Sequence, residues 1–103
     1  MNKYIYLFTR QDLSIPQQII QTAHAVDEMN KLYSSDSDSA NFMVLSGTEN
    51  EISLIKIAKD LAMKGIEFHI FYEPDITSYS AIATIPLALD KRKKLQKYGL
   101  YKA

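Results

Sequence analysis

The order of strand-like and helix-like segments constrains the fold of this chain most. Apolar segments of high β propensity lie at residues 3–9, 42–46, 66–72 and 81–86, and helix-like segments separate the first three of them. A helical crossover joins parallel strands, whereas the short link before the fourth strand suits an antiparallel neighbour. The sequence therefore predicts an α/β fold of three layers, α/β/α. Its four-stranded mixed sheet is expected to have three parallel strands and an antiparallel fourth.

Capping signals place the first helix. Ser14 and Gln17 have the spacing of a capping box, and Pro16 is tolerated in a first helical turn, so we expect a helix over residues 16–33. A polar segment, SSDSDSAN (34–41), predicts a loop after it. The residues expected on the buried side of this helix are Ile19, Ile20, Ala23, Val26, Asn30 and Tyr33.

Two further helices are expected. Thr48 and Glu51 have the spacing of a second capping box, and Gly65 is placed to end the helix that follows. The segment LALDKRKKLQKY (87–98) predicts a closing helix that stops at Gly99.

Length and composition favour one globular domain spanning residues 1–103. Hydrophobic residues make up 47% of the chain, cysteine is absent, and no stretch approaches the roughly 20 apolar residues of a membrane span. The chain starts without the pattern of a signal peptide. We therefore expect a cytoplasmic protein with no disulfide, no cysteine zinc site and no contact with membranes.

Charge is distributed unevenly. Residues 1–89 have six Lys or Arg and eleven Asp or Glu, a net charge of −5, whereas residues 90–103 have six and one, a net charge of +5. A basic end on an acidic body can be a surface that binds phosphates, but a run this short is more often a solvated helix face.

Two glutamines and a histidine follow one side of the first predicted helix. Gln17, Gln21 and His24 stand at positions i, i+4 and i+7, which share a helix face. The helix begins at the edge where the parallel strands end, and open α/β sheets bind ligands at that edge. The three side chains are suited to hydrogen bonding a ligand. The alternative is a half-buried histidine that donates to a carbonyl or caps a neighbouring loop.

Motifs around this helix resemble a known family. An apolar strand is followed by Arg10-Gln-Asp12-Leu13, and the helix contains Gln21-Thr-Ala-His24-Ala25. In this pattern the sequence resembles the archaeal and eukaryotic type of peptidyl-tRNA hydrolase. The later segment EPDITSYSAIATIP looks more like the divergent bacterial and phage branch of that family.

The resemblance implies a mixed four-stranded sheet with helices on both faces, a homodimer, and hydrolysis of the ester bond of peptidyl-tRNA without a metal or other cofactor. Such a reaction needs an oriented water, a proton acceptor and a donor for the developing oxyanion. The candidate catalytic residues are His24, Glu73, Asp75 and Thr77. The candidate substrate-binding residues are Arg10, Asp12, Gln17, Gln21, Lys91, Arg92 and Lys94.

The sequence departs from the family at the start of the helix. The enzymes have a lysine there, and Gln17 occupies the nearest equivalent position, where it supplies no positive charge. The acidic turn is also changed, so either Glu73 or Asp75 can match the family acid. Two functions stay open, a weak peptidyl-tRNA hydrolase and a non-catalytic module of the same fold that binds tRNA or a protein.

Overall fold

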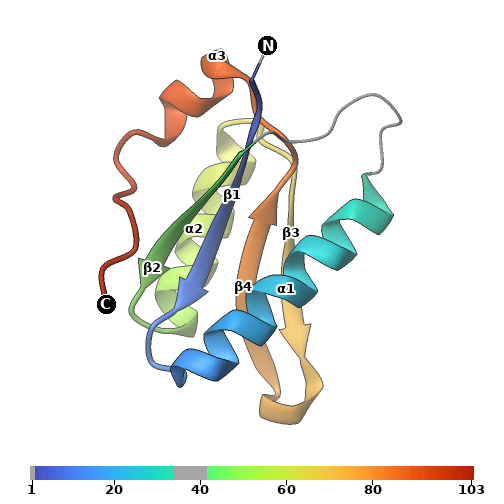
Figure 1. Ribbon diagram of the computed structural model, residues 1–103, viewed down its shortest axis with the longest axis vertical. Coiled ribbons are helices and arrows are strands. Elements are labelled where there is room, and N and C mark those ends of the chain that lie inside the picture. The colour runs from blue at the N-terminus through green and yellow to red at the C-terminus, as the bar shows by residue number, and fades with distance from the viewer. Residues whose placement is uncertain (1, 34–41) are drawn as a thin grey trace.

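A computed structural model describes residues 2–33 and 42–103 (Figure 1). The predicted loop over 34–41 lies outside the described residues. The elements in chain order are β1 (Tyr4–Arg10), α1 (Ile15–Leu32), β2 (Phe42–Thr48), α2 (Glu51–Met63), β3 (Phe68–Glu73), the 3₁₀ turn η1 (Pro74–Ile76), β4 (Ser78–Thr84), α3 (Leu89–Arg92) and the 3₁₀ turn η2 (Lys93–Leu95).

The four strands form one sheet in the order β2-β1-β4-β3. β1 pairs with β2 in parallel, and β4 pairs antiparallel with both β1 and β3. The predicted ladder of three parallel strands is therefore wrong, since only one pair is parallel. The reason is the short turn after Glu73, which folds β3 and β4 into a hairpin and puts β4 against β1. Because β4 runs against both neighbours, β1, β2 and β3 still end at the same edge of the sheet.

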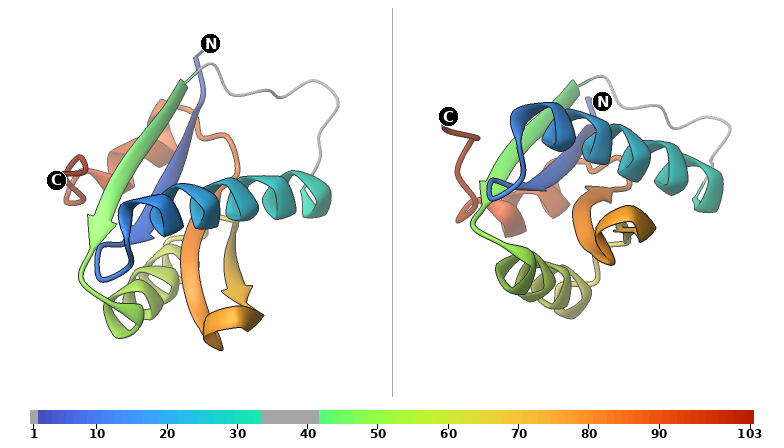
Figure 2. Two further views of the ribbon diagram at one scale, coloured as in Figure 1. Left: turned by 60° about the horizontal axis from the view of Figure 1, so that its bottom comes forward. Right: turned by 90° about the horizontal axis from the view of Figure 1, so that it is seen from below.

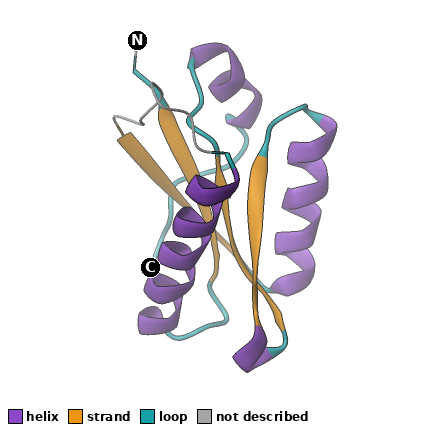
Figure 3. Cartoon of the chain, turned by 90° about the vertical axis from the view of Figure 1, so that its right-hand side faces the viewer, coloured by secondary structure: helices purple, strands orange, loops and turns teal. Residues whose placement is uncertain are grey.

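Helices cover the two faces of this sheet. Figure 2 and Figure 3 show α1 on one face and α2 on the other, with the twisted sheet between them. On the α2 face, Phe8, Leu54, Leu61 and Ile82 are among the buried residues of one apolar cluster. On the α1 face, a smaller cluster comprises Ile5, Ala25, Met29, Ala81 and Ala83. The predicted three-layer α/β arrangement with a mixed four-stranded sheet is confirmed.

The start of α1 matches the sequence prediction, but its buried side does not. Ser14 is the N-cap, and its side chain accepts a hydrogen bond from the backbone N–H of Gln17. The side chains that α1 buries are Gln18, Gln21, Ala25 and Met29. Ile19 and Ile20, expected inside, are 64% and 47% exposed. Buried glutamines are tolerated because both amides have hydrogen-bond partners within the protein.

The capping box of α2 lies two residues later than predicted. Asn50 is the N-cap, and it exchanges hydrogen bonds with Ser53, whose hydroxyl and backbone N–H both take part. Thr48 instead ends β2 and donates its hydroxyl hydrogen to Ser53 Oγ. The other end agrees with the prediction, since Gly65 follows the last turn with a φ of 70°.

The closing helix is shorter than the predicted span of residues 87–98. Leu87 is still extended, because it exchanges two backbone hydrogen bonds with Tyr4. Helical structure begins only at Leu89, as the short α3, and continues as η2 up to Leu95. Figure 1 shows α3 at the amino end of β1, far from the edge where β1 ends.

A cluster around Asp60 fastens this C-terminal region to α2. Tyr98 donates its hydroxyl hydrogen to Asp60 Oδ2 at 2.5 Å, and the ammonium groups of Lys64 and Lys97 lie 2.9 and 3.3 Å from the same oxygen. The Tyr98 hydrogen bond, with those cations, lowers the pKa of Asp60 from 3.8 to about 2. Burial, followed by the bond to Asp60, raises the pKa of Tyr98.

This cluster makes a prediction about acid stability. Because the pKa of Asp60 is about 2 in the folded protein and near its ordinary 3.8 in the unfolded chain, its contribution is present above pH 3.8 and lost as the pH falls through about 2. Asp60→Asn should lower the free energy of unfolding at pH 7 and flatten its decline in acid. Urea unfolding followed by circular dichroism across this pH range measures both effects.

The matched control is Asp27→Asn, which removes an exposed ion pair with Lys31, one helical turn away. It should leave the acid profile close to that of the wild type. An Asp60→Asn profile parallel to the wild-type profile at every pH would contradict the role assigned to this carboxylate.

Candidate functional site

Arg10 joins the end of β1 to the β3–β4 hairpin. Its Nε and Nη2 donate to the two oxygens of Asp12 at 3.0 and 2.7 Å. Its Nη1 donates to Ser78 Oγ at 2.8 Å and to the Tyr79 carbonyl at 3.0 Å. The hydrogen bonds between Arg10 and Asp12 raise the pKa of the first and lower the pKa of the second. These two predicted residues lie together, and their mutual bonds fix the shape of this edge.

A second carboxylate at this edge, that of Glu51, contacts the hairpin from α2. Glu51 was expected to complete a capping box with Thr48. Its Oε2 instead accepts a hydrogen bond at 2.8 Å from the backbone N–H of Tyr79, on β4. Glu51 also helps to raise the pKa of Arg10 through its charge. The first turn of α2 therefore supports the same hairpin that Arg10 holds.

Gln17 and Gln21 of α1 form a chain of hydrogen bonds with Ser80. Gln21 donates from Nε2 to Gln17 Oε1 at 3.1 Å and accepts from the Ser80 hydroxyl at 2.8 Å. Ser80 and Gln21 are buried, whereas Gln17 is exposed. The bonds fix the orientation of the Gln21 amide, and through it they orient the Gln17 side chain at the surface.

Ser80 occupies this position because β4 is irregular there. Phe71 of β3 pairs with Ala81 and Tyr72 pairs with Tyr79, so that Ser80 is an extra residue between the two pairs. Such a bulge redirects a side chain relative to the regular alternation of a strand. Here it turns the Ser80 hydroxyl toward α1.

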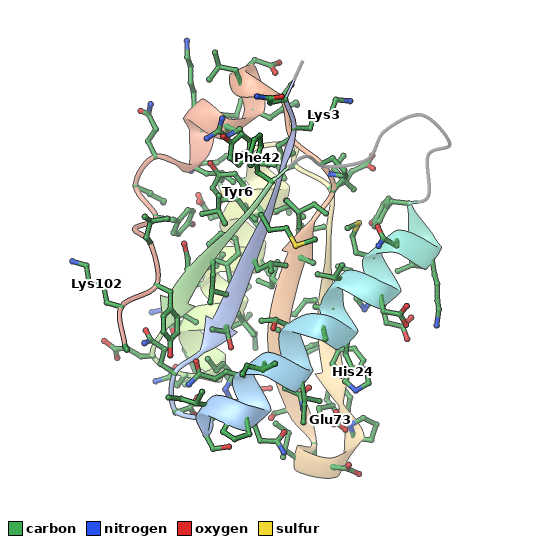
Figure 4. The ribbon with its side chains drawn as sticks, in the orientation of Figure 1. Lys3, Tyr6, His24, Phe42, Glu73 and Lys102 are labelled. Atoms are coloured by element: carbon green, nitrogen blue, oxygen red, sulfur yellow. The ribbon has the colours of Figure 1, made fainter. Side chains whose placement is uncertain are left out.

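His24 lies on the outer part of the same helix and faces β3. Its ring stacks on Phe71 with 4.9 Å between centroids and 10° between planes. The imidazole is exposed, and neither of its nitrogens has a hydrogen-bond partner among residues 2–33 and 42–103. His24 is thus held by its ring face, while its nitrogens are open to a ligand or to water. Figure 4 shows His24 and Glu73 on the same side of the molecule.

The turn from Glu73 to Thr77 closes the hairpin. Glu73 is the N-cap of η1, and its Oε1 accepts from the backbone N–H of Asp75 at 3.2 Å. Thr77 has a φ of 47°, unusual for a β-branched residue, and its hydroxyl donates to the Ile76 carbonyl. The side chain of Asp75 is exposed. The turn therefore offers two carboxylates to solvent, of which Glu73 also has a structural role.

The basic residues of the C-terminal region do not join this edge. Arg92 lies against the ring of Tyr4, 3.4 Å from its centroid, and donates from Nε to the Tyr6 hydroxyl. Lys94 donates to the carbonyl of Lys64 at 3.2 Å. Lys91, on α3, shares their position at the amino end of β1. The candidate substrate-binding residues Lys91, Arg92 and Lys94 therefore lie apart from those of the carboxyl edge, and their role stays a prediction.

The edge is suited to neutral hydrogen bonding and to one proton transfer. The exposed imidazole of His24 can accept a proton, and the exposed amide of Gln17 can donate to a carbonyl oxygen. The guanidinium of Arg10 has four hydrogen bonds within the protein. Within the described part of the chain, no three histidine or carboxylate side chains approach closely enough to bind a metal ion.

Three residues of this edge were not found from the sequence as site residues: Glu51, Ser78 and Ser80. Their roles depend on the pairing of β4 with β1 and β3, which no local pattern reveals. A signal was present only for Ser78 and Ser80, as polar residues alternating just before the apolar run AIAT. Alternation of this kind indicates that the fourth strand starts before residue 81, the start predicted from the sequence.

Comparisons with known proteins bear on the fold only. No family model matches the chain, and no curated protein matches it. Among solved structures it is similar to Atu0240 from Agrobacterium tumefaciens strain C58, a protein of unknown function, with a TM-score of 0.68, 14% sequence identity and 99% of each chain covered. At this identity the similarity establishes a shared fold. In the described residues, no helix has the length and apolar character needed to cross a membrane.

Proposed function

We propose that this chain is a slow peptidyl-tRNA hydrolase whose reaction takes place at the edge between α1 and the β3–β4 hairpin. The observation that supports the proposal best is the exposed imidazole of His24, stacked on Phe71, on the same side of the molecule as Glu73. The family resemblance of residues 10–13 and 21–25 gives the substrate.

In the proposed mechanism, His24 takes a proton from a water molecule. The water oxygen forms a bond to the ester carbonyl carbon, and the bond from that carbon to the 3′ oxygen of the ribose breaks. The proton then passes from His24 to the leaving oxygen, so that a free peptide and a free tRNA result. Gln17, oriented through Gln21, donates to the developing oxyanion, and Glu73 or Asp75 is the alternative proton acceptor.

A second candidate function is a non-catalytic module that binds tRNA or a protein. It is favoured by the hydrogen bonds that already occupy Arg10 and Gln21, and by the neutral Gln17 in the place of the family lysine. In this case the edge recognises a ligand by neutral hydrogen bonds and catalyses nothing. A homodimer, an RNA partner and a cytoplasmic location belong to the same proposal through the resemblance.

The first test measures cleavage. Single-turnover hydrolysis of a peptidyl-tRNA should be detectable in the wild type and fall by roughly 10²-fold or more in His24→Ala, because the proton acceptor is lost. Gln17→Lys should raise the rate, since it returns a cation to the place where negative charge develops. Gel analysis of acid-quenched samples gives these rates.

Asn30→Ala, an exposed substitution farther along α1, is the matched control and should leave the rate unchanged. Equal rates in the wild type and His24→Ala would refute the mechanism. Binding of the tRNA without cleavage by any variant would support the binding module instead.

The second test concerns the C-terminal basic residues. If Lys91 and Lys93 contact phosphates, each change to glutamine should reduce the slope of log affinity against log salt by about 0.7–0.9. Filter binding of tRNA at several salt concentrations measures the slope. Lys56→Gln, an exposed change on α2, is the control. A slope that stays constant in both C-terminal variants would leave this region as a solvated surface.

A further inference from the structure

A small cavity lies on the α1 face of the sheet, outside the edge described above. Its volume is about 180 Å³, and it is bounded by the first half of α1, the end of β1, the middle of β2, and the C-terminal segment. Ile15, Ile19, Leu45 and Tyr101 form most of its wall. The two isoleucines are 61% and 64% exposed, so that apolar side chains also surround its mouth.

Hydrogen bonds hold the C-terminal side of this cavity in place. Tyr101 donates its backbone N–H to the Leu45 carbonyl at 2.7 Å, and Gln11 donates from its amide to the Lys102 carbonyl at 2.7 Å. Gln11 can lie there only because residue 47 is glycine, since a Cβ at Gly47 would stand 2.0 Å from the Gln11 amide oxygen. These two hydrogen bonds hold the C-terminal segment against β2 and the residue that follows β1, and so keep this side of the cavity in place.

Thr9 is the unusual residue of the cavity wall. Its side chain lies on the α1 face and is only 1% exposed, and its hydroxyl has no hydrogen-bond partner within the part of the chain that the structure describes. Two other polar side chains of the wall are already bonded, because Gln18 donates to the Leu13 carbonyl and Thr22 donates to carbonyls of its own helix. Leaving a buried hydroxyl without a partner destabilises a protein, so Thr9 is the group that an occupant can satisfy.

Among the residues that the structure describes, no charged side chain lines the cavity, whose wall also includes Ala103. Residues 13–26 and 42–48, which supply most of its wall, include no aspartate, glutamate, lysine or arginine. An anion would lose its hydration there without gaining a cationic partner. A single water is also a poor occupant, since a buried water typically needs two to four polar partners. Among residues 2–33 and 42–103, Thr9 Oγ1 is the one buried side-chain nitrogen or oxygen without a hydrogen bond.

We propose that this cavity binds a neutral small molecule with one six-membered ring, or a branched aliphatic group of similar size, and one hydroxyl or carbonyl oxygen. A cavity of about 150 Å³ accepts benzene, so the volume of 180 Å³ leaves room for one polar substituent. Rotation of Thr9 about its Cα–Cβ bond directs the hydroxyl toward that substituent. The inference is independent of the proposed hydrolase activity.

The test uses benzyl alcohol, toluene and benzoate as probes of the full chain, followed by amide chemical shifts in NMR titrations. Benzyl alcohol should saturate one site, with shifts centred on residues 9, 19, 22, 45 and 101. Thr9→Val should weaken the binding of benzyl alcohol about tenfold and change that of toluene by less than twofold, because only the alcohol can form a hydrogen bond with the Thr9 hydroxyl. Thr9→Ser should keep that preference, and benzoate should not bind.

Two variants of β2 test the location. Leu45→Glu places a carboxylate in the wall and should abolish binding of both neutral probes. Met43→Glu, an exposed change on the same strand outside the cavity, should not alter it. Thermal unfolding checks that each variant is folded, and Thr9→Val should unfold at a higher temperature than the wild type because it removes the unpaired hydroxyl.

Several results would overturn the proposal. One is chemical shifts that do not saturate with probe concentration. Another is that Thr9→Val weakens the binding of toluene and of benzyl alcohol equally. The third is that Met43→Glu weakens probe binding as much as Leu45→Glu does. Sedimentation that shows a dimer, with probe binding seen only after dilution to the monomer, would indicate that a second copy of the chain occupies this surface in place of a small molecule.

Discussion

The burial of β4 on both faces is the constraint on which the rest of the structure depends. β4 lies between β1 and β3, and its residues from Ser80 to Thr84 are all buried. Ala81 and Ala83 face α1, and Ile82 belongs to the cluster on the α2 face. Small side chains on one face and a large one on the other allow α1 to lie close to the sheet while α2 rests on a bulkier core. The hairpin that places β4 there is held in turn by Arg10 and Glu51, from β1 and α2.

The same strand links packing to the candidate chemistry. A regular β4 would alternate without interruption, but the extra residue at Ser80 turns a hydroxyl toward α1. That hydroxyl satisfies Gln21, which replaces an apolar side chain on the buried side of the helix. The rotation of α1 that buries Gln18 and Gln21 leaves Ile19 and Ile20 in solvent. The bulge at Ser80 is thus linked to two surface features. One is the hydrogen-bonded pair Gln17 and Gln21 beside His24, and the other is the exposed isoleucines near the Thr9 cavity.

Local signals in the sequence were sufficient for the layers of the fold and for several element ends. Ser14 caps α1 and Gly65 follows α2 with a left-handed conformation, because each depends on neighbours within a few residues. The order of the strands, the buried side of α1 and the partner of Glu51 could not be predicted. Each depends on hydrogen bonds between residues far apart in the chain, such as Gln21 with Ser80 and Glu51 with Tyr79. For the candidate site, the pattern placed Arg10 with Asp12 and Gln17 with Gln21, and it missed every partner supplied by β4.

The separation of the two polar regions restricts the size of any ligand that uses both. His24 and Glu73 lie toward the edge where β1 and β3 end, and Lys91 and Arg92 lie at the amino end of β1. β1 has seven residues, which at about 3.3 Å per residue span roughly 23 Å. The molecule measures 36 Å along its longest axis, so the two regions are separated by most of its length. Under the proposed hydrolase function, a small ester contacts only one of these regions, whereas a tRNA is long enough to reach both. The salt dependence of tRNA binding and the rate of cleavage, as proposed above, would then report on opposite ends of the molecule.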